Sequence, residues 1–150
     1  SQCRQTGDRT SGPTSMMTMT RIPAEPWLKI FAPPQYQSVG LATFEVTNGN
    51  RRMYNTVKQW VGRFSQDTTT GLLLHGTTGV GKTHLAYSIG DALSKKGQWP
   101  YFTNWVDFLA KIKASWNDER LSETAIKEPL LTKRVVIIDD LGTELIAKNG

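Results

Sequence analysis

The stretch Gly76-Thr77-Thr78-Gly79-Val80-Gly81-Lys82-Thr83 decides the fold, because it matches the pattern G-x-x-x-x-G-K-S/T at every defined position. The apolar run at residues 71–75 precedes it and indicates a short buried strand. Apolar residues at helical spacing follow it and indicate one face of a helix; they are Leu85, Ala86, Ile89, Ala92 and Leu93. A strand, a glycine-rich loop and a helix in this order are typical of a P-loop, which binds phosphate groups.

Each residue type in this loop has an expected task in holding a nucleotide. Glycines let backbone N–H groups turn toward a phosphate chain, and the N-terminus of the following helix adds the positive end of its dipole. We expect Lys82 to contact the β- and γ-phosphates and the Thr83 hydroxyl to bind Mg²⁺. His84 belongs to the predicted set, although packing or surface exposure is favoured for its side chain. The alternative interpretation of this motif is a glycine-rich turn that arose by chance and binds no phosphate. The predicted ATP-binding residues are Gly76, Thr77, Thr78, Gly79, Val80, Gly81, Lys82, Thr83 and His84.

A second motif, residues 133–140, is a β-branched apolar run that ends in the carboxylates Asp139 and Asp140. This pattern is typical of a buried strand in a parallel sheet, and such sheets bind ligands at the carboxyl ends of their strands. We expect Asp139 to share Mg²⁺ with Thr83, and Asp140 to polarise a water molecule against the γ-phosphate. Lys82 and Asp140 are therefore the predicted catalytic residues, and Thr83 and Asp139 the predicted metal ligands. A solvated turn is the alternative for the two acids.

Composition fits one globular domain. With 150 residues and 38% hydrophobic content the chain can bury a core, and no apolar stretch approaches the length of a membrane span. No secretory signal is visible and the single cysteine excludes an internal disulfide, so we expect a cytoplasmic protein. The net charge of +5 leans weakly toward polyanionic partners, with a solvated face as the alternative for most Lys and Arg residues.

The order of the predicted strands and helices indicates an α/β fold, with a parallel sheet and flanking helices. Residues 1–32 are expected to form a flexible N-terminal arm, whose apolar residues around Trp27 pack on the domain or on a partner. Residues 33–150 are expected to form the ATP-binding core. A helix is predicted from Asn50, a second strand at residues 99–102, and a helix capped by Asn104. The positions expected to face the core in these helices are Met53, Val57, Val61, Phe64, Phe108, Leu109, Ile112 and Trp116. Base stacking is the less favoured role of Trp105 and Trp116.

Two segments together carry a family resemblance. Residues 71–86, with residues 135–144 downstream, resemble the DnaC/IstB-like branch of AAA+ ATPases, which includes bacterial and phage helicase loaders and transposition helper ATPases. Thr43-Phe44 and the following Asn48-Gly49-Asn50 resemble the element before the P-loop in these loaders. The resemblance covers about residues 33 to 145. It implies that Asp139 is the Mg²⁺ acid, and that Asp140 stands where many AAA+ members have a glutamate base. Glu144 would lie close to the γ-phosphate or to a neighbouring subunit.

The same resemblance implies the strand order 5-1-4-3-2, in which a fourth strand separates the P-loop strand from the Asp139 strand. The sequence printed here ends after the third, so we expect a sheet that is incomplete at the C-terminus, with a gap of about 10 Å. Cys3-Arg4-Gln5-Thr6-Gly7 resembles half of a Cys-x-x-Cys-x-x-Thr-Gly element, and a stray cysteine is the favoured alternative. Both ends are therefore expected to be cut, which makes the chain a fragment of a longer protein.

The expected function is ATP binding and hydrolysis with Mg²⁺. By the resemblance, the complete protein would form an ATP-dependent homo-oligomer that loads a replicative helicase on DNA, in single-stranded form, without membrane contact. A transposition helper ATPase, with a transposase partner and double-stranded DNA, is the closest alternative. A P-loop kinase and a non-catalytic nucleotide-binding adaptor are alternatives from other classes.

Overall fold

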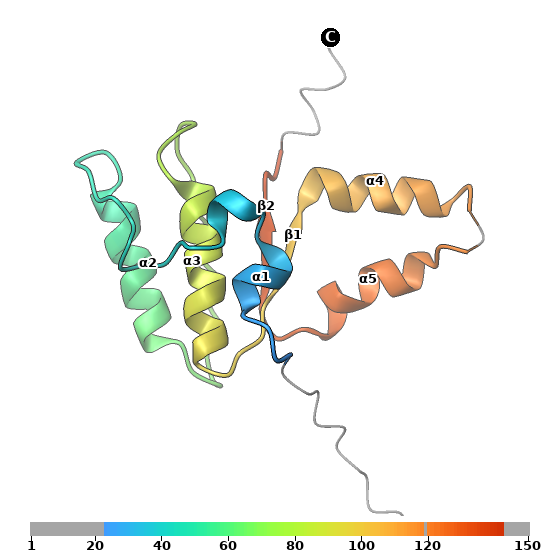
Figure 1. Ribbon diagram of the computed structural model, residues 1–150, viewed down its shortest axis with the longest axis horizontal. Helices are drawn as coiled ribbons and strands as arrows, with labels where there is room; N and C mark the ends of the chain where they lie inside the picture. Colours follow the sequence, from blue (N-terminus) through green and yellow to red (C-terminus); the bar gives the residue numbers. More distant parts are fainter. Residues whose placement is uncertain (1–22, 119, 143–150) are drawn as a thin grey trace, which may run out of the picture.

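The computed structural model describes residues 23–118 and 120–142. In chain order they form α1 (Trp27–Phe31), a 3-10 turn η1 (Pro34–Tyr36), α2 (Arg51–Arg63), α3 (Lys82–Lys95), β1 (Tyr101–Asn104), α4 (Trp105–Ser115), α5 (Glu123–Thr132) and β2 (Val136–Asp139). Figure 1 shows β1 and β2 at the centre, with α2 and α3 on one side and the pair α4 and α5 on the other. None of the helices in the described ranges is long and apolar enough to cross a membrane.

The two described strands form a parallel pair, in a register that matches Tyr101 with Val136 and Asn104 with Asp139. The helices α4 and α5 make the connection between them, as parallel strands require a long crossover. The carboxyl ends of both strands therefore meet at the same edge of the sheet. The α/β architecture predicted from the sequence, a parallel sheet with flanking helices, is confirmed.

The predicted strand at residues 71–75 is wrong, because this segment joins no sheet among the residues that the structure describes. Its side chains still alternate, since Leu72 and Leu74 pack against the core between α2 and α3 while Leu73 is 77% exposed. A cavity of about 830 Å³ is lined by this segment and by residues 134–141 around β2. A strand needs a neighbouring backbone about 4.8 Å away, and among the described residues no backbone hydrogen bond joins the segment to β2. The cavity lies where the resemblance implies an intervening strand.

Two further expectations need correction. The strand β1 begins at Tyr101 rather than Trp99, because Pro100 has no N–H and the first ladder bond runs from Tyr101 N to Val135 O at 3.0 Å. Trp116 is 68% exposed rather than buried, since it lies beyond the last residue of α4. Its indole Nε1 instead donates a hydrogen bond to the Glu123 carboxylate of α5 at 3.1 Å. Figure 1 shows α4 and α5 extending away from the rest of the molecule as an antiparallel pair.

Helix α3 lies between two hydrophobic clusters. One side packs toward α2, where the buried residues are Phe44, Val57, Val61, Leu85, Ile89 and Leu93. The other side packs toward α1 and β1, where they are Trp27, Leu28, Ala32, Ala86, Tyr87 and Phe102. The helix ends where the sequence predicts, after Lys95 and before the left-handed Gly97. The helix that starts at the P-loop is therefore held from both sides.

The described part of the N-terminal arm belongs to this core. The Trp27 side chain is 1% exposed, and its indole Nε1 donates a hydrogen bond to the carbonyl of Pro100 at 2.8 Å. Its ring lies against α3 at Gly90, where a Cβ atom would come within 2.0 Å of the ring. Residues 1–22, including Cys3, and residues 143–150, including Glu144, lie outside the described residues.

Gly90→Ala should lower the free energy of unfolding by about 1–3 kcal/mol, because the Trp27 ring occupies the place of the new methyl group. Gly62→Ala is the matched control, since a Cβ atom at this exposed position of α2 meets nothing within 4 Å. The control should leave stability unchanged or raise it by up to about 1 kcal/mol, because alanine favours a helix over glycine. Urea unfolding followed by tryptophan fluorescence measures both variants. Equal unfolding midpoints would show that α1 does not depend on this contact.

Candidate nucleotide-binding site

Three glycines of the P-loop have a positive φ that favours glycine. The φ angles are 146° at Gly76, 87° at Gly79 and 95° at Gly81. Gly81 also precedes the first residue of α3, and an added Cβ atom there would lie 2.7 Å from the Phe44 ring. A side chain at Gly81 is therefore excluded both by its backbone conformation and by the ring that packs on it.

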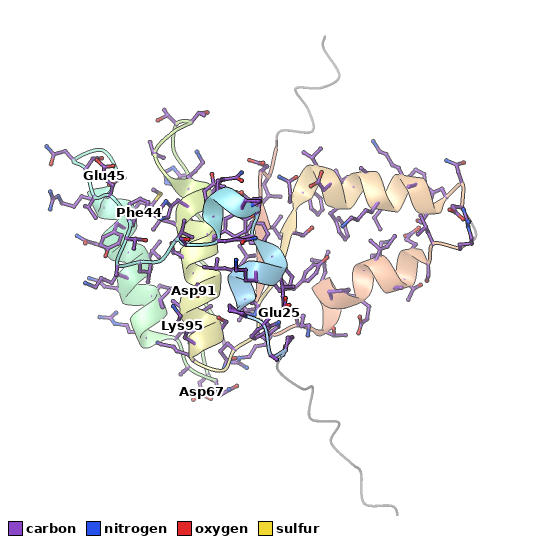
Figure 2. The ribbon with its side chains drawn as sticks, in the orientation of Figure 1. Glu25, Phe44, Glu45, Asp67, Asp91 and Lys95 are labelled. Atoms are coloured by element: carbon purple, nitrogen blue, oxygen red, sulfur yellow. The ribbon has the colours of Figure 1, made fainter. Side chains whose placement is uncertain are left out.

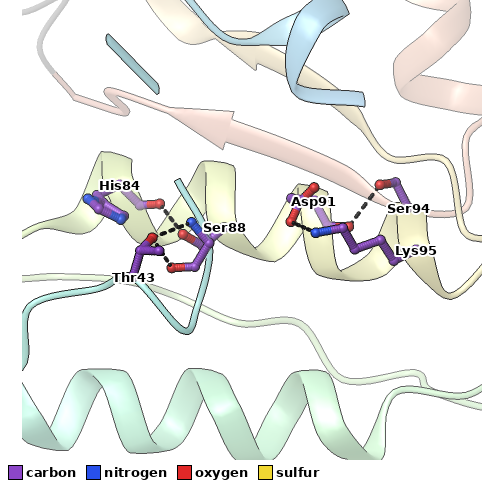
Figure 3. Close-up of polar contacts among 7 residues, drawn as sticks. Thr43, His84, Ser88, Asp91, Ser94 and Lys95 are labelled. Atoms are coloured by element: carbon purple, nitrogen blue, oxygen red, sulfur yellow. Dashed lines mark hydrogen bonds and ion pairs between the residues drawn. The ribbon is translucent and has the colours of Figure 1, made fainter. Parts of the chain in front are cut away.

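The residue that packs on the loop, Phe44, is itself held by a turn and by other rings. The Thr43 hydroxyl accepts a hydrogen bond from Gly40 N at 2.9 Å and donates one to Gly40 O at 3.1 Å, which closes the preceding turn. The Phe44 ring stacks on Tyr54 of α2, with 5.5 Å between ring centroids. The Thr43-Phe44 element of the family resemblance thus links α2 to the start of α3. Thr43 and His84 of α3 line the same cavity, and Figure 3 labels both.

His84, which follows the motif, packs between two aromatic rings. Its ring meets the Phe44 ring edge-on at 5.1 Å and the Tyr36 ring at 6.5 Å. Its Nε2 atom is buried and has no hydrogen-bond partner among the described residues, and burial lowers the pKa of the imidazole below its usual value. The Ser88 hydroxyl on the next turn donates to the His84 carbonyl at 2.9 Å (Figure 3). The neutral imidazole therefore supports the loop by packing.

The positive charge of Lys82 lies beside the first two residues of the P-loop. Its Nζ donates hydrogen bonds to the carbonyls of Gly76 and Thr77, both at 2.9 Å. The side chain also lines the cavity of about 830 Å³, together with Thr78, Asp139 and Asp140. The structure thus places the predicted lysine and both predicted acids around one space.

Other residues of the P-loop line a second cavity. Gly79, Val80, Gly81 and His84 line a cavity of about 480 Å³ together with residues of the segment 43–50. Thr83 lies at the start of α3 beside Lys82 and lines neither of these two cavities. The P-loop therefore contributes different residues to two neighbouring cavities.

The two acids sit where the sheet ends. Asp139 is the last residue of β2, and the chain then turns sharply, with a φ of 57° at Asp140 that a non-glycine residue rarely adopts. The Asp140 Oδ2 atom accepts a hydrogen bond of 2.7 Å from the side-chain amide of Asn104. The register of the sheet explains this contact, because Asn104 ends β1 directly beside Asp139. The acid after β2 is thus held by the neighbouring strand.

Asn104 has a second task, which the sequence analysis predicted. Its Oδ1 atom accepts hydrogen bonds from the backbone N–H groups of Val106 at 3.0 Å and Asp107 at 3.3 Å, and so caps α4. The contact with Asp140 was missed. The sequence shows a polar residue at the end of each segment, but only the register of β1 and β2 brings the two side chains together.

Tyr87 of α3 borders the acids without adding charge. Burial, and then the negative charges of Asp139 and, to a lesser extent, Asp140, raise the pKa of the Tyr87 phenol to about 12. Its ring is stacked between Phe102 of β1, at 4.2 Å, and Tyr36 at 5.0 Å. The phenol is therefore neutral near pH 7, so the charges at this edge of the site come from Lys82 and the two carboxylates.

Comparisons with known proteins identify the family of this chain. The family of IstB-like ATP binding proteins matches residues 37–150. A putative ATP-binding protein of insertion sequence IS232 from Bacillus thuringiensis subsp. berliner is 44% identical over 68 residues, which are 45% of this chain and 26% of the relative. The uncharacterized protein YdaV of Escherichia coli strain K12 is 25% identical over 77% of this chain and 46% of the relative. The chain thus spans less than half the length of these curated relatives.

Solved structures show the same fold. AMPPCP-bound DnaA from Aquifex aeolicus aligns with a TM-score of 0.56 and 24% identity, over 74% of this chain and 33% of that one. A DNA replication initiation factor aligns with a TM-score of 0.58 and 24% identity, over 75% of this chain and 35% of that one. One conclusion follows from the P-loop between α2 and α3, the parallel strands and the family match. This chain belongs to the IstB-like ATP-binding proteins and has the fold of an AAA+ P-loop ATPase domain.

Proposed function

We propose that this chain is the ATP-binding core of an AAA+ protein that hydrolyses ATP with Mg²⁺. The observation that carries the proposal is the single cavity around which Lys82, Asp139 and Asp140 lie. A cation and two carboxylates at the carboxyl end of a parallel strand, next to a glycine-rich loop, are the groups that phosphoanhydride hydrolysis requires. The lysine and the two acids come from segments more than fifty residues apart in the sequence, so the fold itself brings these groups together.

The phosphate chain is bound by the loop in this proposal. Backbone N–H groups of residues 76–81 and the N-terminus of α3 attract the phosphates, and Lys82 exchanges the carbonyls of Gly76 and Thr77 for β- and γ-phosphate oxygens. The second cavity, beside Gly79 and Phe44, leaves room for the nucleoside. Its wall carries aromatic and backbone groups, which suit a base and a ribose.

Magnesium is proposed to be held by Thr83 and Asp139. The described residues contain no group of three or more His, Cys, Asp or Glu side chains that would bind a metal by themselves. A hydroxyl and one carboxylate suit Mg²⁺, which usually keeps several waters and takes its remaining ligands from substrate phosphates. The ion, when bound, would neutralise charge on the phosphates.

Asp140 is proposed as the base that orients the attacking water, and Asn104 as its positioning residue. The short hydrogen bond from the Asn104 amide restricts the Asp140 carboxylate, which stands on a backbone turn with positive φ. A carboxylate held in one place is a better base for a water molecule than a mobile one.

The partners of the complete protein are proposed from the family resemblance and from the similar proteins. The family resemblance supports a helicase loader that acts on a replicative helicase and on DNA as an ATP-dependent homo-oligomer. The solved structure of DnaA with AMPPCP and single-stranded DNA, whose TM-score to this chain is 0.52 at 20% identity, has the same fold. The IS232 relative, at 44% identity over 68 residues, favours the second candidate, a transposition helper ATPase with a transposase partner.

Lys82→Ala should weaken the binding of ATP by tens-fold or more, because losing a charge-assisted phosphate contact costs about 2–3 kcal/mol. Titration with a fluorescent ATP analogue measures the affinity. Lys111→Ala is the matched control, since Lys111 is an exposed lysine of α4 outside both cavities. Unchanged affinity in the Lys82 variant would contradict the assignment of residues 76–83 as a phosphate-binding loop.

Asp140→Asn should leave ATP affinity nearly intact and lower turnover by about a hundredfold or more, the usual range for the loss of a general base. Asp139→Asn should instead weaken binding in the presence of Mg²⁺, with little change in its absence. Phosphate release and nucleotide titration, each with Mg²⁺ and with EDTA, separate the two effects. Identical behaviour of the two variants would contradict the division of roles between the acids.

Asn104→Ser should keep the cap of α4, because serine caps helices as well as asparagine, but it removes the amide that holds Asp140. We expect normal thermal stability, normal ATP affinity and a turnover reduced several-fold. Asn104→Ala should in addition lose about 1 kcal/mol of stability with the cap. A serine variant with the turnover of the original chain would show that Asn104 serves only the helix.

A further inference from the structure

The turn before α2 contains the pair Asn48-Gly49, and both residues are exposed. The hydrogen bonds that close this turn pass over the pair, since the backbone nitrogens of Asn50 and Arg51 donate to the Thr47 carbonyl at 3.3 and 2.9 Å. Among residues 23–118 and 120–142, no group forms a hydrogen bond with the Asn48 side-chain amide or with the Gly49 backbone N–H. These two neighbouring groups are therefore available for reaction.

An asparagine that precedes a glycine is able to form a ring with the backbone. The Gly49 nitrogen loses its proton and attacks the side-chain carbonyl carbon of Asn48, the bond from that carbon to the amide nitrogen breaks, and ammonia leaves. Water then opens the resulting succinimide at one of its two carbonyls, which yields aspartate or isoaspartate. Water is the only co-reactant, because nothing is oxidised or reduced. Glycine favours the attack since it has no Cβ beside the attacking nitrogen, and around Gly49 only the Thr47 hydroxyl lies within 4 Å of an added Cβ, at 3.8 Å.

The other asparagines of the described ranges lack this combination. Both ends of the Asn50 amide are hydrogen-bonded, at 2.7 and 3.0 Å, and the Asn104 amide caps α4 and donates to Asp140. Asn55 lies inside α2, where helical hydrogen bonds hold the next backbone nitrogen. Asn117 is exposed, but the residue after it carries a side chain. Of these five asparagines, Asn48 alone has an unbonded amide next to a glycine.

This turn forms part of the wall of the cavity of about 480 Å³. Thr47, Gly49 and Asn50 line that cavity opposite the P-loop residues 79–81, and Figure 2 labels Phe44 and Glu45 on the segment that leads into the turn. The Asn50 side chain holds the wall together, because its Oδ1 accepts from Thr47 N and its Nδ2 donates to the Glu45 carbonyl. The shape of this wall therefore depends on the short path of the chain from Thr47 to Asn50.

Isoaspartate changes that path, because a side-chain carbon becomes part of the backbone and lengthens it by one atom between residues 48 and 49. The reciprocal hydrogen bonds of Thr47 with Asn50 span this point, so the longer backbone does not keep both. We propose that Asn48 is a site of spontaneous succinimide formation, and that its conversion to isoaspartate displaces the wall of the second cavity and weakens nucleotide binding. The effect on binding rests on the proposed function, whereas the modification itself does not.

The first test follows the modification in the full chain during incubation at neutral and at mildly alkaline pH. Peptide mass spectrometry locates each amide that becomes an acid, and an isoaspartate-specific methyltransferase labels isoaspartate. Conversion of Asn48 should be many-fold faster than that of Asn50, and faster at the higher pH, because the attacking nitrogen must lose its proton. Gly49→Ala should slow it many-fold, since the new methyl group crowds the attack while the fold has room for it. Asn149 also precedes a glycine and lies outside the described residues, so its peptide is quantified separately.

The second test compares the affinity for a fluorescent ATP analogue before and after this incubation. Asn48→Ser removes the reacting amide, and Asn48→Asp adds the charge of the product on a backbone of normal length. Both variants, freshly prepared, should bind like the fresh original chain, because the side chain of residue 48 is not among those that line the cavity. Incubation should weaken binding by the original chain several-fold, in step with its isoaspartate content, and leave Asn48→Ser unchanged.

Each part of the proposal has its own contrary result. Conversion of Asn48 no faster than that of Asn50, or equally fast in Gly49→Ala, would overturn the modification site. Full conversion with unchanged affinity would overturn its effect on the cavity. An equal loss of affinity in fresh Asn48→Asp would assign the effect to charge and overturn the role of the longer backbone. A fresh original chain that binds no ATP analogue would contradict the proposed function, while the mass spectra would still decide the modification.

Discussion

The burial of α3 from several directions is the constraint on which the rest of the structure depends. Seven of its residues are buried, and its neighbours are α1, α2 and β2. Because Lys82 is the first residue of this helix, the position of the P-loop follows from hydrophobic packing around Leu85 and Leu93, which are fully buried. The contact of Trp27 with Gly90 and that of Phe44 with Gly81 leave no space for a Cβ atom. A loop that binds phosphates is thus anchored by apolar contacts at both ends of the helix that follows it.

The chemistry of the site depends on a second constraint, the parallel pairing of β1 with β2. Parallel strands end at the same edge, so the register that matches Asn104 with Asp139 also brings the Asn104 amide to the carboxylate of Asp140. One asparagine therefore connects the cap of α4 to the edge of the nucleotide site. Any shift of this register would separate the two groups, because successive residues of a strand point to opposite faces.

The two sides of α2 differ in composition and in role. Its inner side packs Val57 and Val61 against α3 and stacks Tyr54 on Phe44, which in turn lies against the P-loop. Its outer side carries only cations, amides, a hydroxyl and a glycine. Because the two sides are parts of one rigid element, the outer surface has a fixed place relative to the nucleotide site.

The amino-acid sequence by itself determined the local elements of this protein. The glycines and Lys82 predicted the P-loop, helical spacing predicted α2 and α3, and Asn104 predicted the start of α4, because each depends on neighbours within a few residues. Tertiary structure decided what depends on distant partners. Residues 71–75 have the pattern of a strand, but a strand exists only with a paired backbone, and an open cavity lies beside them. In the same way, Trp116 has the spacing of a core residue yet lies beyond the end of its helix. The bond between Asn104 and Asp140 required a strand register, which no local pattern contains.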